Sequence, residues 1–188
     1  MLSLASLWLP WLVAAVLVFV ASSLIHMVFR WHASDYRKLP DEDAVRAALK
    51  GGSLPAGQYT VPHCGDMKDM QSPEMQQKFR EGPVAMLLVR APGLPAMGPM
   101  LGQWFALNLL VSGIVACVLA CTLAPGAEAH RVFHLAALIG FIAYAGGSIS
   151  DGIWKGQPWG AVAKDLLDAL IYGAATGGAY ALLWPAAT

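Results

Sequence analysis

The sequence has little charge and little cysteine. Of its 188 residues, 12 are Lys or Arg and 12 are Asp or Glu, so 13% are charged, against about 25% in ordinary soluble domains. Because the formal net charge is zero, the basic excess typical of nucleic-acid-binding proteins is missing, and no nucleic-acid partner is expected. The three cysteines are an odd number, and Cys117 and Cys121 lie one helical turn apart in an apolar stretch, which argues against a disulfide scaffold.

The sequence also lacks the common motifs of catalysis. It contains no nucleophile elbow, no phosphate-binding loop, no dinucleotide fingerprint and no HExxH zinc motif. We therefore expect a protein that is not an enzyme and that has no cofactor.

Long apolar segments are abundant instead. Hydrophobic residues make up 57% of the chain, and the charged ones gather between Arg30 and Arg90. Each apolar segment is close to the roughly 20 residues that span a bilayer core. The pattern predicts one all-α integral membrane domain over residues 1–188, a four-transmembrane-helix bundle with helices at about 7–29, 101–123, 132–153 and 165–184.

The basic residues and tryptophans predict how this bundle sits in the membrane. Lys and Arg follow the first helix, precede the second and occupy the link between the third and fourth, whereas only Arg131 lies in the other loop. The positive-inside rule then places both termini outside and the 31–99 insertion in the cytoplasm. All seven tryptophans fall near predicted helix ends, where indole rings favour the membrane interface, at positions 8, 11, 31, 104, 154, 159 and 184.

The 31–99 insertion has its own local signals. Pro40 and the acidic residues after it predict a short helix ending near Lys50, and Ser72-Pro73 predicts the start of a second one. The segments 57–62 and 83–89 have the pattern of short strands, which predicts a two-stranded β-ribbon. Because such a ribbon is marginally stable alone in water, we expect it to pack on the membrane, on the helix ends or on another subunit.

Polar residues recur on single faces of the predicted helices, mostly in the cytoplasmic half. Since a polar group facing lipid is costly, these faces should turn inward and meet. The candidate polar cluster comprises His26, Arg30, Asn108, Tyr144, Ser148, Asp151, Asp168 and Tyr172, and we expect Arg30 and His26 to meet Asp151 and Asp168. One interpretation is a structural cluster that fixes helix order. The other is a path for protons or a small solute, but no polar face continues into the outer half.

A second set of polar and sulfur side chains lies in the insertion. His63, Cys64, Met67 and Met70 have the ligand types that soft metals prefer. Their spacing matches no zinc template, and methionine also serves as an adaptable packing residue. We therefore predict no metal site and keep these four residues as weak candidates.

Small residues are frequent in the last two helices, and Gly173 and Gly177 have the G-x-x-x-G spacing that allows close helix approach. They could serve packing inside the bundle or self-association between chains, and the sequence does not separate these uses.

The last third of the chain resembles a family of small bacterial four-helix membrane proteins known only as a domain of unknown function. The resemblance rests on Ser150-Asp-Gly-Ile-Trp-Lys-Gly-Gln-Pro-Trp159, Asp168, Tyr172, the run 173–178 and Trp184. The chain departs from the family at the end of the first helix, where Phe29-Arg30-Trp31 replaces the usual Trp-Tyr, and in its long insertion. The resemblance implies four spans and no particular activity.

These observations favour a non-enzymatic protein of a bacterial inner membrane. We expect it to form a homo-oligomer or to act as an accessory subunit beside other membrane proteins, with the 31–99 insertion as its docking element. The alternative is a small transporter or channel component that uses the cytoplasmic His, Arg and Asp residues.

Overall fold

The computed structural model describes residues 2–187, which form two compact units. The helical bundle contains the chain up to Arg37 and again from Ala96 onward. The insertion unit, Lys38–Pro95, folds separately. Residues 31–37 therefore belong to the bundle, although the sequence pattern assigns them to the insertion.

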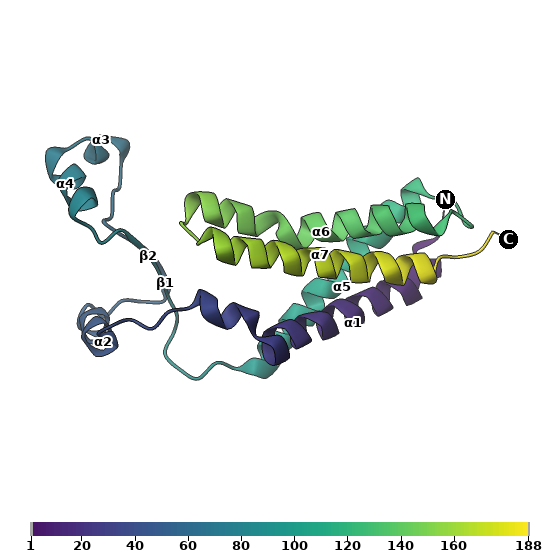
Figure 1. Ribbon diagram of the computed structural model, residues 1–188, viewed down its shortest axis with the longest axis horizontal. Coiled ribbons are helices and arrows are strands. Elements are labelled where there is room, and N and C mark those ends of the chain that lie inside the picture. Colours follow the sequence, from purple (N-terminus) through teal and green to yellow (C-terminus); the bar gives the residue numbers. More distant parts are fainter. Residues whose placement is uncertain (1, 188) are drawn as a thin grey trace. The chain divides into compact units, whose positions relative to one another are not determined.

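The bundle is built from four helical segments, which the ribbon in Figure 1 shows. The first begins with a 3₁₀ turn at Leu4–Leu7, continues as α1 (Trp8–Ser23) and ends in a π-helical turn at Leu24–Phe29. The other three are α5 (Met97–Thr122), α6 (Ala129–Trp154) and α7 (Trp159–Leu182). All four overlap the predicted apolar segments, but α7 begins six residues before the predicted start at 165.

Three of these segments are long and apolar enough to cross a membrane: Leu4–Phe29, Met97–Thr122 and Ala129–Trp154. Each has 26 residues, and a helix of that length extends about 39 Å, more than the roughly 30 Å of a hydrocarbon core. The chain is thus a multi-pass membrane protein. The helix α7 has a comparable length, but its first turns carry Lys164, Asp165 and Asp168.

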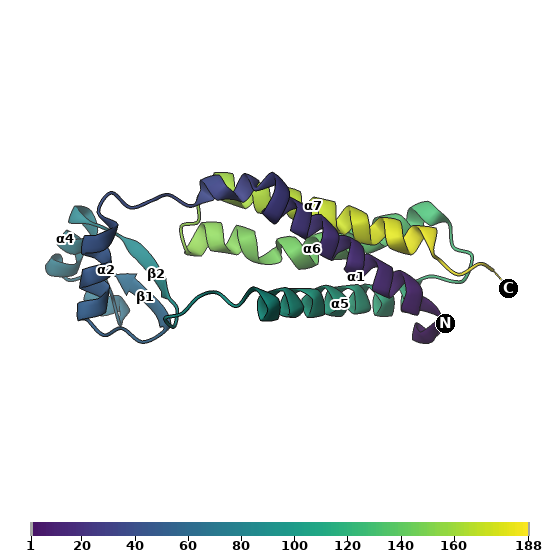
Figure 2. The same cartoon turned by 90° about the horizontal axis from the view of Figure 1, so that it is seen from below.

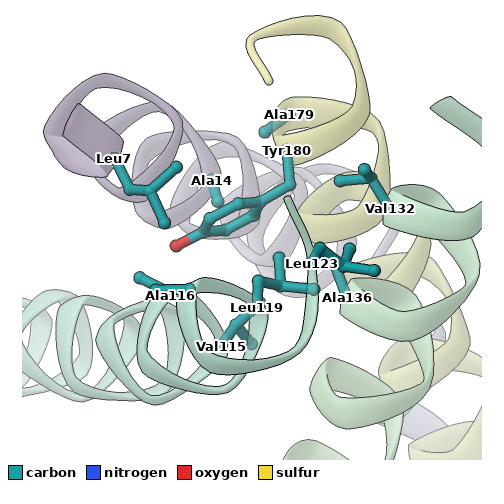
Figure 3. Packing of buried hydrophobic residues seen from close by; sticks show 11 residues of the cluster. Leu7, Ala14, Val115, Ala116, Leu119, Leu123, Val132, Ala136, Ala179 and Tyr180 are labelled. Carbon is teal, nitrogen blue, oxygen red and sulfur yellow. The ribbon is translucent and has the colours of Figure 1, made fainter. Parts of the chain in front are cut away.

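The helices are arranged as a ring in which α1 contacts α5 and α7, and α6 contacts α5 and α7. Both views show α6 alongside α7, and the start of α1 near the end of α7 (Figure 1, Figure 2). The core near this end surrounds Tyr180, whose ring packs among Leu7, Leu119 and their neighbours (Figure 3). The Tyr180 hydroxyl donates to the carbonyl of Ser112 at 2.7 Å, so this buried polar group is satisfied.

Glycines bring α6 and α7 into backbone contact. A Cβ on Gly173 would lie 2.7 Å from the carbonyl oxygen of Ala137, and one on Gly177 would lie 2.8 Å from that of Phe133. A Cβ on Gly140 would in turn lie 3.2 Å from the Cα of Gly173. The G-x-x-x-G pair is therefore used for packing inside the bundle, which is one of the two uses its spacing allows.

The insertion unit contains α2 (Glu42–Gly51), β1 (Gly57–Val61), α3 (Met67–Met70), α4 (Pro73–Glu81) and β2 (Ala85–Val89). The strands pair antiparallel, with Tyr59 opposite Leu87, which confirms the predicted ribbon. The side chains of Asp41 and Ser72 accept from backbone N–H groups and cap α2 and α4. The short helix α3 has no counterpart in the sequence prediction.

Candidate functional site: a histidine–aspartate centre

The chain bends where the first helical segment ends. After the π-helical turn, Arg30 adopts a left-handed conformation with φ of 52°, and a 3₁₀ turn follows at Trp31–Asp35. A non-glycine residue pays a steric cost there, so surrounding contacts must hold the turn in place. The bend places Trp31 and His32 against α7, beside His26.

Asp168 of α7 is the residue on which these side chains converge. It is only 5% exposed. Its Oδ1 accepts from the indole N–H of Trp31 at 3.1 Å, and its Oδ2 lies 2.9 Å from Nε2 of His32 and 3.6 Å from Nε2 of His26. We call His26, His32 and Asp168 the His/Asp centre. A buried carboxylate with these partners joins the first helical segment, the 3₁₀ turn at Trp31–Asp35 and α7.

His32 is held between two carboxylates. Its Nδ1 lies 2.9 Å from Oδ2 of Asp35, while its Nε2 faces Asp168. An imidazole that is protonated on both nitrogens donates to both acids, which satisfies all three groups.

Lys164 orients Asp35 from α7. Its ammonium donates to Asp35 Oδ1, to the carbonyl of Trp31 at 2.9 Å and to the hydroxyl of Ser34 at 2.7 Å. The hydrogen bond from Lys164 to Asp35, together with the one from His32, lowers the pKa of the Asp35 carboxyl, although desolvation acts in the opposite direction. Because the folded-state pKa is the lower one, the stabilisation is present above the unfolded pKa and is lost as the pH falls through the folded value.

A second polar layer lies deeper in the same half of the bundle. The indole of Trp104 donates to the Ser22 hydroxyl at 2.7 Å, and the hydroxyl of Tyr144 donates to Asn108 Oδ1 at 3.1 Å. The rings of Tyr144 and Tyr172 meet edge to face, with centroids 5.3 Å apart. These bonds connect α1 with α5 and α5 with α6, so the layer fixes helix order.

The structure thus brings together five of the eight predicted cluster residues, in two layers: His26 and Asp168 in one, and Asn108, Tyr144 and Tyr172 in the other.

The remaining three lie elsewhere. Arg30 is exposed at the bend, and in the described residues it forms no ion pair with either expected aspartate. Asp151 pairs instead with Lys155, one helical turn away at 2.6 Å. Ser148 is half-buried in α6.

The weak metal candidates of the insertion unit do not assemble into a site. The Cys64 thiol donates to the carbonyl of Asp66 at 3.0 Å, and His63 Nδ1 lies 3.4 Å from the Thr60 hydroxyl. Met67 is 74% exposed and Met70 is 44% exposed. Within residues 2–187, one group of three His, Cys, Asp or Glu side chains is close enough together to hold a metal ion. This group is the His/Asp centre.

Sequence reasoning missed His32, together with the roles of Trp31, Asp35 and Lys164. In a continuous α-helix, His26 and His32 would point about 120° apart, so their juxtaposition depends on the π-helical turn and the left-handed Arg30. The available signal was the grouping of His26, His32 and Asp35 at the end of an apolar run.

A cavity of about 470 Å³ borders this centre, lined by His26, His32, Asp35, Tyr36, Gln157, Pro158, Ala161 and Asp165. Gln157 donates to Asp165 Oδ2 at 2.7 Å. The side chain of His26 is 50% exposed and lies on the wall of this cavity.

In comparisons with protein-family models, curated proteins and solved structures, the chain has no match. The family resemblance of the last third stays a prediction.

Proposed function

We propose that this protein is a non-enzymatic accessory subunit of a bacterial inner-membrane complex. It crosses the membrane four times, with α7 as the fourth span, both termini outside and the insertion unit in the cytoplasm. The insertion unit is the element that docks other subunits.

The carrying observation is that the insertion unit lacks a closed core. None of the residues 38–95 is fully buried, and its inward-facing side chains, such as Tyr59 and Leu87, are only half-buried. A segment of this size that buries so little, with a ribbon of just two strands, has little stability of its own. It gains stability when a partner covers it.

The ribbon presents an apolar surface for this purpose. Pairing places Met86 opposite Thr60 and Leu88 opposite Gln58, on the face away from Tyr59 and Leu87. Met86 is 45% exposed and Leu88 is 71% exposed. Both strands also leave an unpaired edge, which another strand can extend.

Charge favours a protein partner over the lipid surface. Residues 38–95 contain seven Lys or Arg and seven Asp or Glu, so their net charge is 7 − 7 = 0. Binding to anionic headgroups relies on basic clusters, which this balanced surface does not offer.

Replacing Leu88 with lysine is expected to abolish partner binding, because the charge would be buried at the contact. The measurement is gentle purification of the full chain from native membranes, followed by native mass. The wild type should retain a second polypeptide in fixed stoichiometry, and Leu88→Lys should lose it. Gln71→Lys, an exposed change outside the ribbon, should keep it. A wild type that purifies as a single chain would contradict the proposal. A wild type that purifies as a homo-oligomer would mean that the partner is a second copy of this chain and not another subunit.

One observation supports a second candidate, a component of a small transporter or channel. The His/Asp centre borders a cavity that reaches its titratable side chains. Proton or ion flux in liposomes containing the protein, lost in Asp165→Asn, would favour this function over docking.

A further inference from the structure

We infer that the His/Asp centre binds a divalent first-row transition ion of the zinc type, through Nε2 of His26, Nε2 of His32 and Oδ2 of Asp168. This inference concerns a different surface from the insertion unit and does not depend on docking.

The ligand atoms are spaced for one shared ion. All three lie within 4.8 Å of one another, and Asp168 Oδ2 lies 2.9 Å from His32 and 3.6 Å from His26. Ligands held at about 2.1 Å from a metal lie about 3.0–3.4 Å apart in octahedral or tetrahedral geometry. Small side-chain rotations therefore suffice to close the site.

His32 and Asp168 are the two less exposed ligands. Each has a supporting hydrogen-bond partner that contacts an atom other than its ligand atom. Asp35 accepts from Nδ1 of His32, which directs Nε2 toward the ion, and Lys164 holds Asp35 in turn. The indole N–H of Trp31 donates to Oδ1 of Asp168, so Oδ2 is the oxygen that would bind the ion. Carboxylate–histidine–metal relays of this kind orient ligands in zinc sites.

Charge balance also favours a dication. Asp35, Asp165 and Asp168 lie around His32, and Lys164 of α7 pairs with Asp35. The ion would bind Nε2 of His32, so the contact between Nδ1 and Asp35 is kept.

The ligand set indicates the class of metal. Two imidazoles and one carboxylate suit Zn²⁺, Co²⁺ or Fe²⁺ rather than Mg²⁺ or Ca²⁺, which prefer oxygen ligands. Three protein ligands leave the remaining coordination positions to water or to a solute from the bordering cavity.

Zinc binding to the full-length protein in detergent tests the inference, with His26→Ala as the decisive variant. His26 is half-exposed and contacts Asp168 at 3.6 Å, so its loss leaves the bonds of Trp31 and His32 in place. Because loss of a supporting group alone costs about 10–100-fold in affinity, loss of this direct ligand should weaken Zn²⁺ binding by more than about 100-fold. Asp35→Asn should weaken it by about 10–100-fold.

The control concerns a different histidine pair. His130 and His134 lie one turn apart on α6, with ring centroids 6.3 Å apart, and such a pair can bind zinc on its own. The double variant His130→Ala/His134→Ala should still bind one Zn²⁺ per chain, and Co²⁺ in its place should show a d–d spectrum without thiolate charge transfer. Stoichiometric binding that persists when His26→Ala is added to the double variant, or that disappears in the double variant itself, would overturn the inference, as would no stoichiometric binding by the wild type.

Discussion

Replacing Asp168 with alanine is expected to lower the free energy of unfolding of the bundle by about 3–5 kcal/mol. The substitution removes the acceptor of Trp31 and one of the two carboxylates that hold His32. Both donors then stay in a part-buried site without their partner, and an unsatisfied buried group costs about 1–3 kcal/mol. Thermal unfolding in detergent, followed by circular dichroism, measures the loss.

Asp151→Ala is the matched control. Asp151 is also an aspartate near a helix end, but its partner Lys155 is half-exposed at the C-cap of the same helix. Exposed pairs at this spacing contribute about 0.3–0.5 kcal/mol. Equal losses in the two variants would mean that Asp168 carries no special role in joining α1 to α7.

Gly177→Ala is expected to destabilise the bundle by about 1–3 kcal/mol. The added methyl group would lie 2.8 Å from the carbonyl oxygen of Phe133 and 2.9 Å from the Cβ of Ala137. Backbone atoms cannot rotate away, so α6 and α7 must separate. The same unfolding experiment reports the effect.

Gly178→Ala gives the comparison at the next position, where a Cβ would meet nothing within 4 Å. Since alanine forms helices better than glycine by about 1 kcal/mol, this variant should be as stable as the wild type or slightly more so. If Gly177→Ala left stability unchanged but altered the mass of the native particle, these glycines would serve self-association instead.

Much of the fold could be predicted because its signals are local. Apolar runs of spanning length mark the helices, and Ser72-Pro73 marks the start of α4 with its cap. Asn108 and Tyr144 could be grouped from helical periodicity, since both lie in regular helices.

The centre was only half predictable because it depends on irregular backbone. His26 and Asp168 follow from helix faces, but His32 reaches them only after the left-handed turn at Arg30. The tryptophans show a related limit. Their positions suggest interface anchors, yet Trp11 donates to the carbonyl of Leu109 at 2.7 Å, and Trp31 and Trp104 also donate across the bundle. A tryptophan near a helix end can serve either as an interface anchor or as a hydrogen-bond donor inside the bundle, and its position in the sequence does not distinguish the two roles.

The four-span arrangement is tested most directly by locating the two ends of the chain. Single cysteines introduced at Ser3 and Ala187, in a background without the native cysteines, can be labelled in intact cells with a membrane-impermeant maleimide. A cysteine at Gln71 of the insertion unit serves as the inside marker. Four spans with both termini outside predict that both end positions are labelled and that Gln71 is labelled only after lysis. Labelling at Ser3 alone, with position 187 protected until lysis, would mean that α7 does not cross the membrane and would contradict the account.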